Sequence, residues 1–158
     1  MPLMTADTLA DQILQRVDEV PALYYRLILV VGPTGVGKTA ALQVEAARTG
    51  SAVCNVNLEL SRRMLDLTER QRAMRVPRLL SDIVNTAAPG LALLDNTEML
   101  FDVSLQLDPL RLLEGLSRNR PVVATWNGTI EGDYLTYAVP DHLEHRRYPV
   151  GNLLIVTP

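Results

Sequence analysis

Apolar residues follow two alternating patterns along this chain. Short runs that are almost wholly apolar occupy residues 27–31, 52–58, 91–95, 122–126 and 153–156. Runs of this length without a polar face predict buried strands. Between them, apolar residues recur at the three- and four-residue spacing of helices that bury one side. Strands that alternate with helices indicate an α/β fold, in which helices cover both faces of a mostly parallel sheet.

The helical spacing is found in four segments. These are residues 5–20, 40–48, 60–87 and 108–118. Pro77 lies inside the third segment, where we expect it to end or kink the helix because proline has no backbone N–H. Residues 128–150 contain several glycines and prolines, so we expect a long loop or hairpin before the last strand.

Composition limits the class of protein. The chain has 158 residues, of which 47% are hydrophobic, and a net charge of −3. These values fit a single domain over residues 1–158. Residues 1–20 are expected to be its N-terminal helix, because residues 5–20 have helical spacing. One cysteine, Cys54, excludes a disulfide framework and fits a reducing compartment. Because no apolar run approaches the roughly 18 residues of a membrane-spanning helix, we expect a soluble cytoplasmic protein with no membrane partner.

The only lysine of the chain, Lys38, belongs to the strongest motif. The pattern G-x-x-x-x-G-K-[ST] of a P-loop is matched by Gly32, Pro33, Thr34, Gly35, Val36, Gly37, Lys38 and Thr39, and Ala40 continues into a predicted helix. In such a loop the backbone N–H groups surround phosphate oxygens, the ammonium reaches the β- and γ-phosphates, and the Thr39 hydroxyl ligates Mg²⁺. The alternative is a glycine-rich turn with a surface lysine.

A second Mg²⁺ ligand is expected at Asp95, which ends the third apolar run. In isolation Asp95 would also suit a turn. The next residue is Asn96, where hydrolytic relatives usually have glutamate, and Glu98 follows two positions later. Asparagine can hold a water molecule but cannot take its proton. We therefore expect hydrolysis that is slow, or that depends on Glu98 or on a neighbouring subunit.

Polar residues also follow the fourth run. Thr125 and Asn127 would lie at the carboxyl edge of the sheet, where open α/β proteins bind ligands. Asn127 could there sense a γ-phosphate, although Asn127-Gly128 is also a strong turn signal. Trp126 and the lone cysteine are expected in the core.

Arginines form two groups of interest. Arg146 and Arg147 precede the last strand, where an arginine finger could reach a neighbouring subunit's nucleotide, unless they are ordinary surface residues. Arg118 and Arg120 are weaker candidates. A basic segment, Arg62, Arg63, Arg70, Arg72, Arg75 and Arg78, is opposed only by Asp66 and Glu69, which leaves a net charge of +4. It carries no aromatic residues, so a protein partner or a subunit interface is favoured over DNA.

The P-loop, Asp95, Thr125 with Asn127, and the late arginines together resemble a minimal AAA+-type P-loop ATPase core. More narrowly, the chain resembles the BrxF family, the small P-loop proteins of type 3 BREX (bacteriophage exclusion) defence systems. The resemblance extends over residues 27–39, 55–63, 93–96, 108–113, 116–120 and 126–128. It implies a three-layer P-loop NTPase core with strand order 5-1-4-3-2, ATP and Mg²⁺ as cofactors, a bacterial host, and other BREX proteins as partners.

Two departures from the wider AAA+ pattern affect the expected activity. The glutamate after Asp95 is absent, and we expect no helical lid after the fifth strand. We therefore expect an ATP-binding subunit with weak or partner-stimulated hydrolysis, which assembles with itself only when nucleotide is bound. The alternatives are a nucleotide-gated scaffold that never hydrolyses and a small-molecule kinase.

Overall fold

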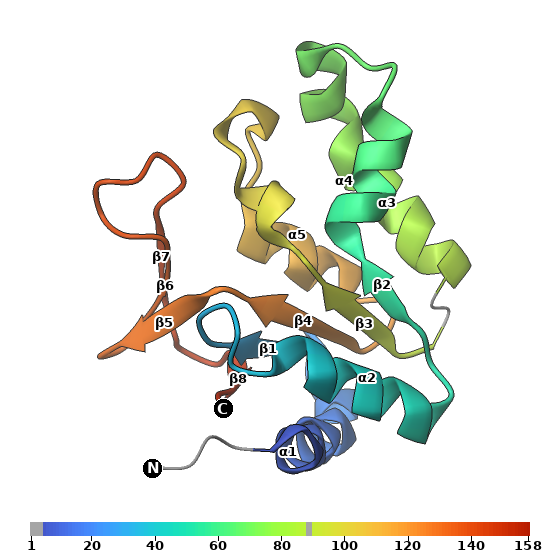
Figure 1. Ribbon diagram of the computed structural model, residues 1–158, viewed down its shortest axis with the longest axis vertical. Helices are drawn as coiled ribbons and strands as arrows, with labels where there is room; N and C mark the ends of the chain where they lie inside the picture. The colour runs from blue at the N-terminus through green and yellow to red at the C-terminus, as the bar shows by residue number, and fades with distance from the viewer. Residues whose placement is uncertain (1–4, 88–89) are drawn as a thin grey trace.

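A parallel sheet of five strands organises the chain (Figure 1). The computed structural model describes residues 5–87 and 90–158. The strands are β1 (Leu27–Val31), β2 (Val53–Asn55), β3 (Ala92–Asp95), β4 (Val122–Trp126) and β8 (Leu154–Val156), in the order β2-β3-β4-β1-β8. All four neighbouring pairs are parallel. The α/β fold with a parallel sheet is therefore confirmed. The expected order 5-1-4-3-2 has the fifth strand of the chain beside β1. In the structure that neighbour is the eighth strand, β8, because three further strands precede it.

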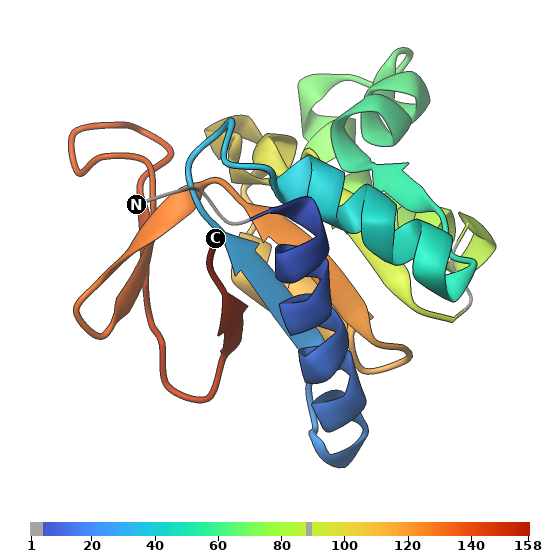
Figure 2. The same ribbon diagram turned by 60° about the horizontal axis from the view of Figure 1, so that its bottom comes forward.

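Helices cover both faces of this sheet (Figure 2). One face carries α1 (Ala6–Glu19) and α2 (Lys38–Thr49), and the other carries α3 (Val56–Met64), α4 (Glu69–Ala87) and α5 (Pro109–Leu116). Strand β1 shows how the faces are divided, because its side chains alternate. Ile28 and Val30 pack with the residues of α1 and α2, whereas Leu27, Leu29 and Val31 pack with those of α3 to α5. The first four residues of the predicted N-terminal helix lie outside the described residues.

The second strand is shorter than predicted. Residues 56–58 were expected in a strand over 52–58 but form the first turn of α3. The cause is Asn55, whose side chain accepts a hydrogen bond of 3.0 Å from the Leu58 N–H and so caps the helix. The predicted strand is wrong at its carboxyl end because a capping asparagine was taken as part of an apolar run.

The break in the long helical region also differs from the prediction. Helix α3 ends at Met64 and α4 begins at Glu69, while Pro77 lies within α4 without ending it. Thr68 and Gln71 form a capping box at the start of α4: the Thr68 N–H donates to Gln71 Oε1 at 3.0 Å, and the Gln71 N–H donates to Thr68 Oγ1 at 3.2 Å. This reciprocal cap, rather than the proline, determines where the helices separate.

Residues 128–150 are not a loop or a single hairpin but a second sheet. It consists of β5 (Gly128–Glu131), β6 (Tyr134–Tyr137) and β7 (Arg146–Pro149), all antiparallel. Gly132 has φ of +61° in the tight β5–β6 turn, a conformation that glycine adopts without strain. The small sheet is attached to the end of β4 by the buried Trp126, whose indole N–H donates to the Thr136 carbonyl at 3.0 Å.

Two 3₁₀ segments connect β3 to α5. They are η2 (Glu98–Phe101) and η3 (Val103–Leu105), and a third, η1 (Val20–Ala22), follows α1. Phe101 stacks on Tyr137 with ring centroids 3.5 Å apart and contacts Trp126 edge to face. This aromatic cluster joins η2 to both sheets, and it fixes the backbone that carries Glu98. No helix in the described part of the chain is long and apolar enough to cross a membrane.

Candidate phosphate-binding site

The loop between β1 and α2 contains two glycines with left-handed backbone conformations. Gly35 and Gly37 have φ of +90° and +96°, in the region that favours glycine, and a Cβ built on either would meet nothing within 4 Å. Gly37 is the N-cap of α2 and provides no side-chain hydrogen bond to it. The first N–H groups of α2 therefore point out of the helix with no capping side chain, as an anion at a helix N-terminus requires.

Gly32 has a different role in this loop. Its N–H donates to the Trp126 carbonyl at 3.1 Å, which continues the pairing of β1 with β4 beyond the strand. A Cβ at this position would lie 2.9 Å from Val36 Cγ2. A larger residue at Gly32 would therefore displace the Val36 side chain, whereas the φ of Gly32 is not unusual.

Lys38 lies under the loop and is 6% exposed. Its Nζ donates to the carbonyl oxygens of Gly32 and Pro33, each at 2.6 Å. Burial lowers the pKa of Lys38 from its ordinary value, and the charges of Asp95 and Glu98 oppose that decrease. The ammonium is thus held across the loop on the side that faces two carboxylates.

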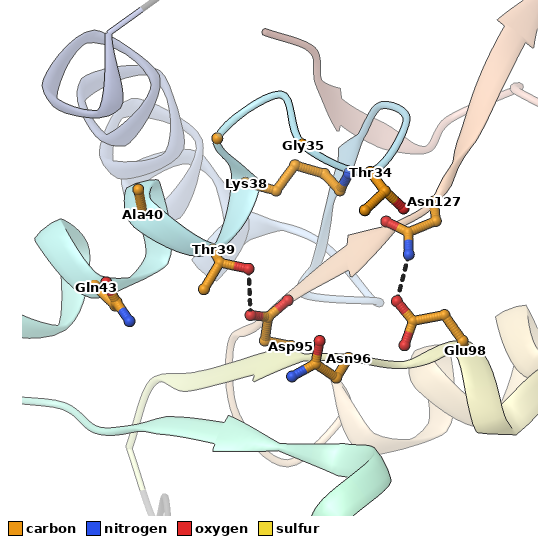
Figure 3. Close-up of a pocket in the computed structure, with 11 residues that line it drawn as sticks. Thr34, Gly35, Lys38, Thr39, Ala40, Gln43, Asp95, Asn96, Glu98 and Asn127 are labelled. Atoms are coloured by element: carbon orange, nitrogen blue, oxygen red, sulfur yellow. Dashed lines mark hydrogen bonds between the residues drawn. The ribbon is translucent and has the colours of Figure 1, made fainter.

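Asp95 connects three elements of the site (Figure 3). It ends β3, is 5% exposed, and accepts two hydrogen bonds: one of 2.7 Å from Thr39 Oγ1 and one of 2.9 Å from Thr125 Oγ1. The two threonines come from α2 and β4. Both carboxylate oxygens are therefore held in place, and Thr39 and Asp95, the two predicted metal ligands, lie side by side.

Glu98 is held by two asparagine side chains. Asn127 Nδ2 donates to Glu98 Oε1, and Asn57 Nδ2 donates to Glu98 Oε2 at 3.0 Å. Asn57 also accepts the Met99 N–H at 2.9 Å through its Oδ1, and its own N–H donates to the Asn96 carbonyl at 3.0 Å. Asn57 therefore holds the side chain of Glu98 and also the backbone at the start of η2.

Asn57 was missed by sequence reasoning because it was assigned to a strand. A signal for it existed, since Asn55 and Asn57 are the only polar residues in the run 52–58. Polar residues at the carboxyl end of a strand in a parallel sheet lie at the edge that binds ligands. The same logic found Asn127, and it applies equally to Asn57.

These side chains surround one cavity of about 440 Å³. Its lining consists of Thr34, Gly35, Gly37, Lys38, Thr39, Ala40, Gln43, Asp95, Asn96, Glu98 and Asn127. Figure 3 shows the side chains of Lys38, Thr39, Asp95 and Asn127 converging from the loop, α2 and the ends of β3 and β4. Ten of these eleven residues were predicted site residues, and Gln43 was not. Three predicted residues, Gly32, Pro33 and Val36, instead line a separate cavity of about 320 Å³ on the outer side of the loop.

Asn96 has a left-handed backbone conformation. Its φ is +53°, which is uncommon for any residue except glycine but is tolerated by asparagine. Its carbonyl is held by the Asn57 N–H, and the next residue, Thr97, donates through Oγ1 to the Thr125 carbonyl at 2.7 Å. The chain therefore turns sharply after Asp95, which brings Glu98 rather than Asn96 opposite Asn127.

The late arginines lie outside this cavity. Arg146 Nη2 donates to the Leu107 carbonyl at 2.6 Å, and the Arg147 guanidinium lies 3.5 Å from the ring centroid of Tyr134. Both are therefore engaged within their own chain. The weaker candidates are also engaged, because Arg120 is buried against Asn85 and Arg118 lies over Tyr24.

No dense metal cluster accompanies the site. Within residues 5–87 and 90–158, no three side chains of His, Cys, Asp or Glu gather as a metal site. His142 and His145 instead support a loop: the Glu144 N–H donates to His142 Nδ1 at 3.0 Å.

Comparison with known proteins gives little beyond this geometry. No protein-family model matches the chain, and no curated protein matches it. Among solved structures, the chain is similar to PCH-2 of C. elegans, with a TM-score of 0.47 and 16% identity over 96% of this chain and 41% of that chain. It thus spans less than half the length of that protein. A similarity this low assigns neither a family nor an activity.

Proposed function

We propose that this protein binds ATP with Mg²⁺ in the 440 Å³ cavity and hydrolyses it slowly or when a partner stimulates it. In this proposal it is an AAA+-type P-loop ATPase subunit. The observation that carries the proposal is the convergence of Lys38, the uncapped first turn of α2 and the Thr39–Asp95 pair on one cavity.

The charges around the cavity support a nucleotide accompanied by a cation. Lys38 and the N-terminus of α2 attract phosphate, but Asp95 and Glu98 line the same space. A triphosphate alone would enter beside two carboxylates and be repelled by them. A divalent ion next to Asp95 removes that repulsion, and oxygen ligands are what Mg²⁺ prefers.

Each residue has a defined part in this proposal. Thr39 and Asp95 would hold Mg²⁺, and Lys38 with the N–H groups of residues 35–40 would hold the phosphates. Bound Mg²⁺ supplies charge neutralisation on the phosphate oxygens. Asn127 would contact the γ-phosphate or position a water molecule. Glu98 is the residue able to accept the proton of that water, because Asn96 has no basic group.

Slow turnover is expected from the hydrogen bonds of Glu98. Both of its oxygens already accept amide hydrogens, one from Asn57 and one from Asn127. Each oxygen keeps a second lone pair, but the two amides hold the carboxylate in one orientation and so limit how it can meet a water molecule. The same observation favours a second candidate function, a nucleotide-gated scaffold that binds ATP but does not hydrolyse it.

The test is phosphate release and ATP binding by the purified protein and three variants. Lys38→Ala is expected to lose both binding and turnover, and Asp95→Asn to lose the Mg²⁺ dependence of binding. The control is Gln43→Ala, which removes a lining side chain that has no role in the proposal. Equal turnover by wild type and Lys38→Ala would contradict the proposed role of Lys38. Binding that is lost in Lys38→Ala, with no phosphate release in any sample, identifies the scaffold; transfer of the γ-phosphate to a metabolite identifies a kinase.

Partners follow only from the resemblance to BrxF. On that basis we place the protein among BREX proteins, with itself and those proteins as partners and DNA as a less favoured one. Arg146 or Arg147 would act in trans only after leaving its own contact. Co-purification with the other proteins of the same defence system, with and without ATP, tests this assignment.

A further inference from the structure

The helical arm formed by α3 and α4, residues 56–87, exposes apolar side chains between arginines. Leu65 and Met74 are 75% and 74% exposed, and Leu58 is 44% exposed. Leu58, Arg62 and Leu65 share the outer side of α3, and Arg70, Met74 and Arg78 share the outer side of α4, because residues three and four apart are neighbours on a helix. Each exposed apolar group on the arm therefore has a guanidinium beside it.

The arginines of α4 are not neutralised within the chain. Among the described residues, the ion pairs of the arm are those of Arg62 and Arg63 with Glu59. Arg70, Arg75 and Arg78 are exposed and form no ion pair there. Asp82 is the exposed acidic residue four positions after Arg78, but it forms no ion pair with Arg78 in the described part of the chain. Three exposed cations next to exposed leucine and methionine form a surface that favours an acidic, apolar partner.

The loop between β6 and β7, residues 138–145, has the opposite charge and the same apolar character. Leu143 is 88% exposed and Val139 is 66% exposed. Asp141 and Glu144 flank Leu143, and the loop contains neither lysine nor arginine. It therefore offers an apolar anchor between two carboxylates.

This loop is fixed by its own hydrogen bonds. The His142 N–H donates to the Val139 carbonyl at 2.9 Å, and the His145 N–H donates to the His142 carbonyl at 3.1 Å. The Glu144 N–H donates to the His142 ring at 3.0 Å. A loop that is already ordered loses little entropy on binding, which is what an anchor at an interface requires.

We propose that the loop 138–145 of one copy of this chain docks on the outer side of the α3–α4 arm of a second copy. Leu143 packs against Leu65 and Met74, and Asp141 and Glu144 face the free arginines of α4. The two surfaces lie apart on the molecule, with the arm and the loop projecting separately in Figures 1 and 2. Because one copy offers both surfaces, the contact is head to tail and produces a ring or an open chain of subunits.

The charge balance favours a second copy over nucleic acid. The segment from Arg62 to Arg78 carries +4 in a chain whose net charge is −3, so the rest of the molecule is acidic. Nucleic acid would pair with the arginines but would leave Leu58, Leu65 and Met74 uncovered. The arm also contains no aromatic side chain on which a base could stack.

The experiment is a mass measurement by sedimentation across a range of protein concentrations without nucleotide, because neither surface includes a residue that lines the cavity. This contact therefore departs from the nucleotide-dependent assembly expected from the sequence, and the outcome is independent of the proposed ATPase activity. The arm variant carries Arg70→Glu, Arg75→Glu and Arg78→Glu, and the loop variant carries Asp141→Arg and Glu144→Arg. The matched control carries Glu131→Arg and Asp133→Arg in the exposed β5–β6 turn. Circular dichroism checks that each variant is folded.

Wild type and control are expected to exceed the monomer mass. Each reversed variant alone is expected to associate at least about tenfold more weakly. An equimolar mixture of the arm and loop variants restores association, because the intact loop of one then meets the intact arm of the other. The proposal is overturned if wild type stays monomeric at every concentration, or if the reversed variants keep the wild-type mass. It is also overturned if the mixture stays monomeric, or if wild type remains a monomer that binds duplex DNA through the arm.

Discussion

Replacing Glu45 should stabilise this protein. Glu45 lies in the middle of α2, on the side that packs against α1, and its side chain is completely buried. Neither of its carboxylate oxygens has a hydrogen-bond partner among residues 5–87 and 90–158. Burial raises the pKa of Glu45, with the nearby Asp11 and Asp18 acting in the same direction and Arg48 against it. An apolar residue of similar length removes the cost of burying these oxygens.

The size of the effect follows from that cost. A buried polar group without a partner destabilises the folded state by about 1–3 kcal/mol. Glu45→Met keeps the length of the side chain, favours helix as strongly, and replaces the buried carboxylate with a flexible apolar group. We therefore expect the free energy of unfolding to rise by about 1–3 kcal/mol at pH 7.5. For a chain of this size the melting temperature should rise by roughly 2–10 °C.

The effect should depend on pH with a definite sign. The carboxyl of Glu45 has an ordinary pKa of 4.5 in the unfolded chain and a raised pKa in the folded protein. Between these two pKa values the folded state binds more protons than the unfolded state, so wild-type stability falls as pH rises through that window. Below 4.5 both states are protonated and the charge-dependent part of the penalty disappears. The stability difference between Glu45→Met and wild type should therefore be larger at pH 7.5 than at pH 4.5.

Urea unfolding followed by circular dichroism at a series of pH values measures this difference. Glu45→Gln is the matched control, because it keeps the polar atoms but cannot ionise. It should remove the pH-dependent part of the penalty and retain the rest. If Glu45→Met is no more stable than wild type at pH 7.5, or if wild type and Glu45→Gln have parallel pH profiles, Glu45 does not carry an unpaired buried charge.

Three further predictions concern other parts of the molecule. Gly128→Ala should lower the urea midpoint by an amount equivalent to about 1–3 kcal/mol, because the added Cβ would clash with the Thr136 carbonyl. An unchanged midpoint would contradict the predicted clash. Tyr148→Phe should lower the free energy of unfolding by about 1 kcal/mol in the same assay, because the hydroxyl donates at 2.9 Å to Asp108, the N-cap of α5. A loss below the error of the assay would show that water replaces this hydrogen bond. Asn57→Ala should raise ATP turnover severalfold with little change in ATP affinity, because Glu98 loses one of the two amide donors that restrain it. Lower turnover would show instead that Asn57 positions Glu98 for hydrolysis, and a loss of affinity would place Asn57 in binding.

The sequence predicted the central sheet well because its strands are buried on both faces. Such strands read as uninterrupted apolar runs, and β1, β3 and β4 lie within one residue of the predicted bounds. Predictions failed where a single polar side chain decided the structure. Asn55 converts the end of an apolar run into a helix, and the Thr68–Gln71 capping box, not Pro77, separates α3 from α4. Local hydrogen bonds of this kind outweigh both apolar pattern and propensity.

The second sheet was missed for a different reason. Residues 128–150 contain glycine and proline at its turns and edges, which is typical of loops as well as of short antiparallel strands. What holds the three strands is long-range, namely the packing of Leu135 and Tyr137 against Phe101 and Trp126. No local pattern carries that information. The residues around Lys38 and Asp95 were predictable because their spacing is fixed by chemistry, whereas Asn57 reaches the site only through the tertiary fold.

Asn57 connects the cavity to the surface on which a second copy is proposed to dock. It is the second residue of α3, and the exposed Leu58 follows it directly. A contact that shifts the first turn of α3 must move Asn57. The Asn57 side chain holds Glu98 Oε2 and the Met99 N–H, and the Asn57 backbone N–H holds the Asn96 carbonyl. Glu98 would then keep only the Asn127 donor. A carboxylate that keeps one amide donor is freer to turn toward a water molecule than one held by two. Docking on the arm therefore has a direct physical route to hydrolysis, and stimulation by a partner requires no movement of Lys38, Thr39 or Asp95.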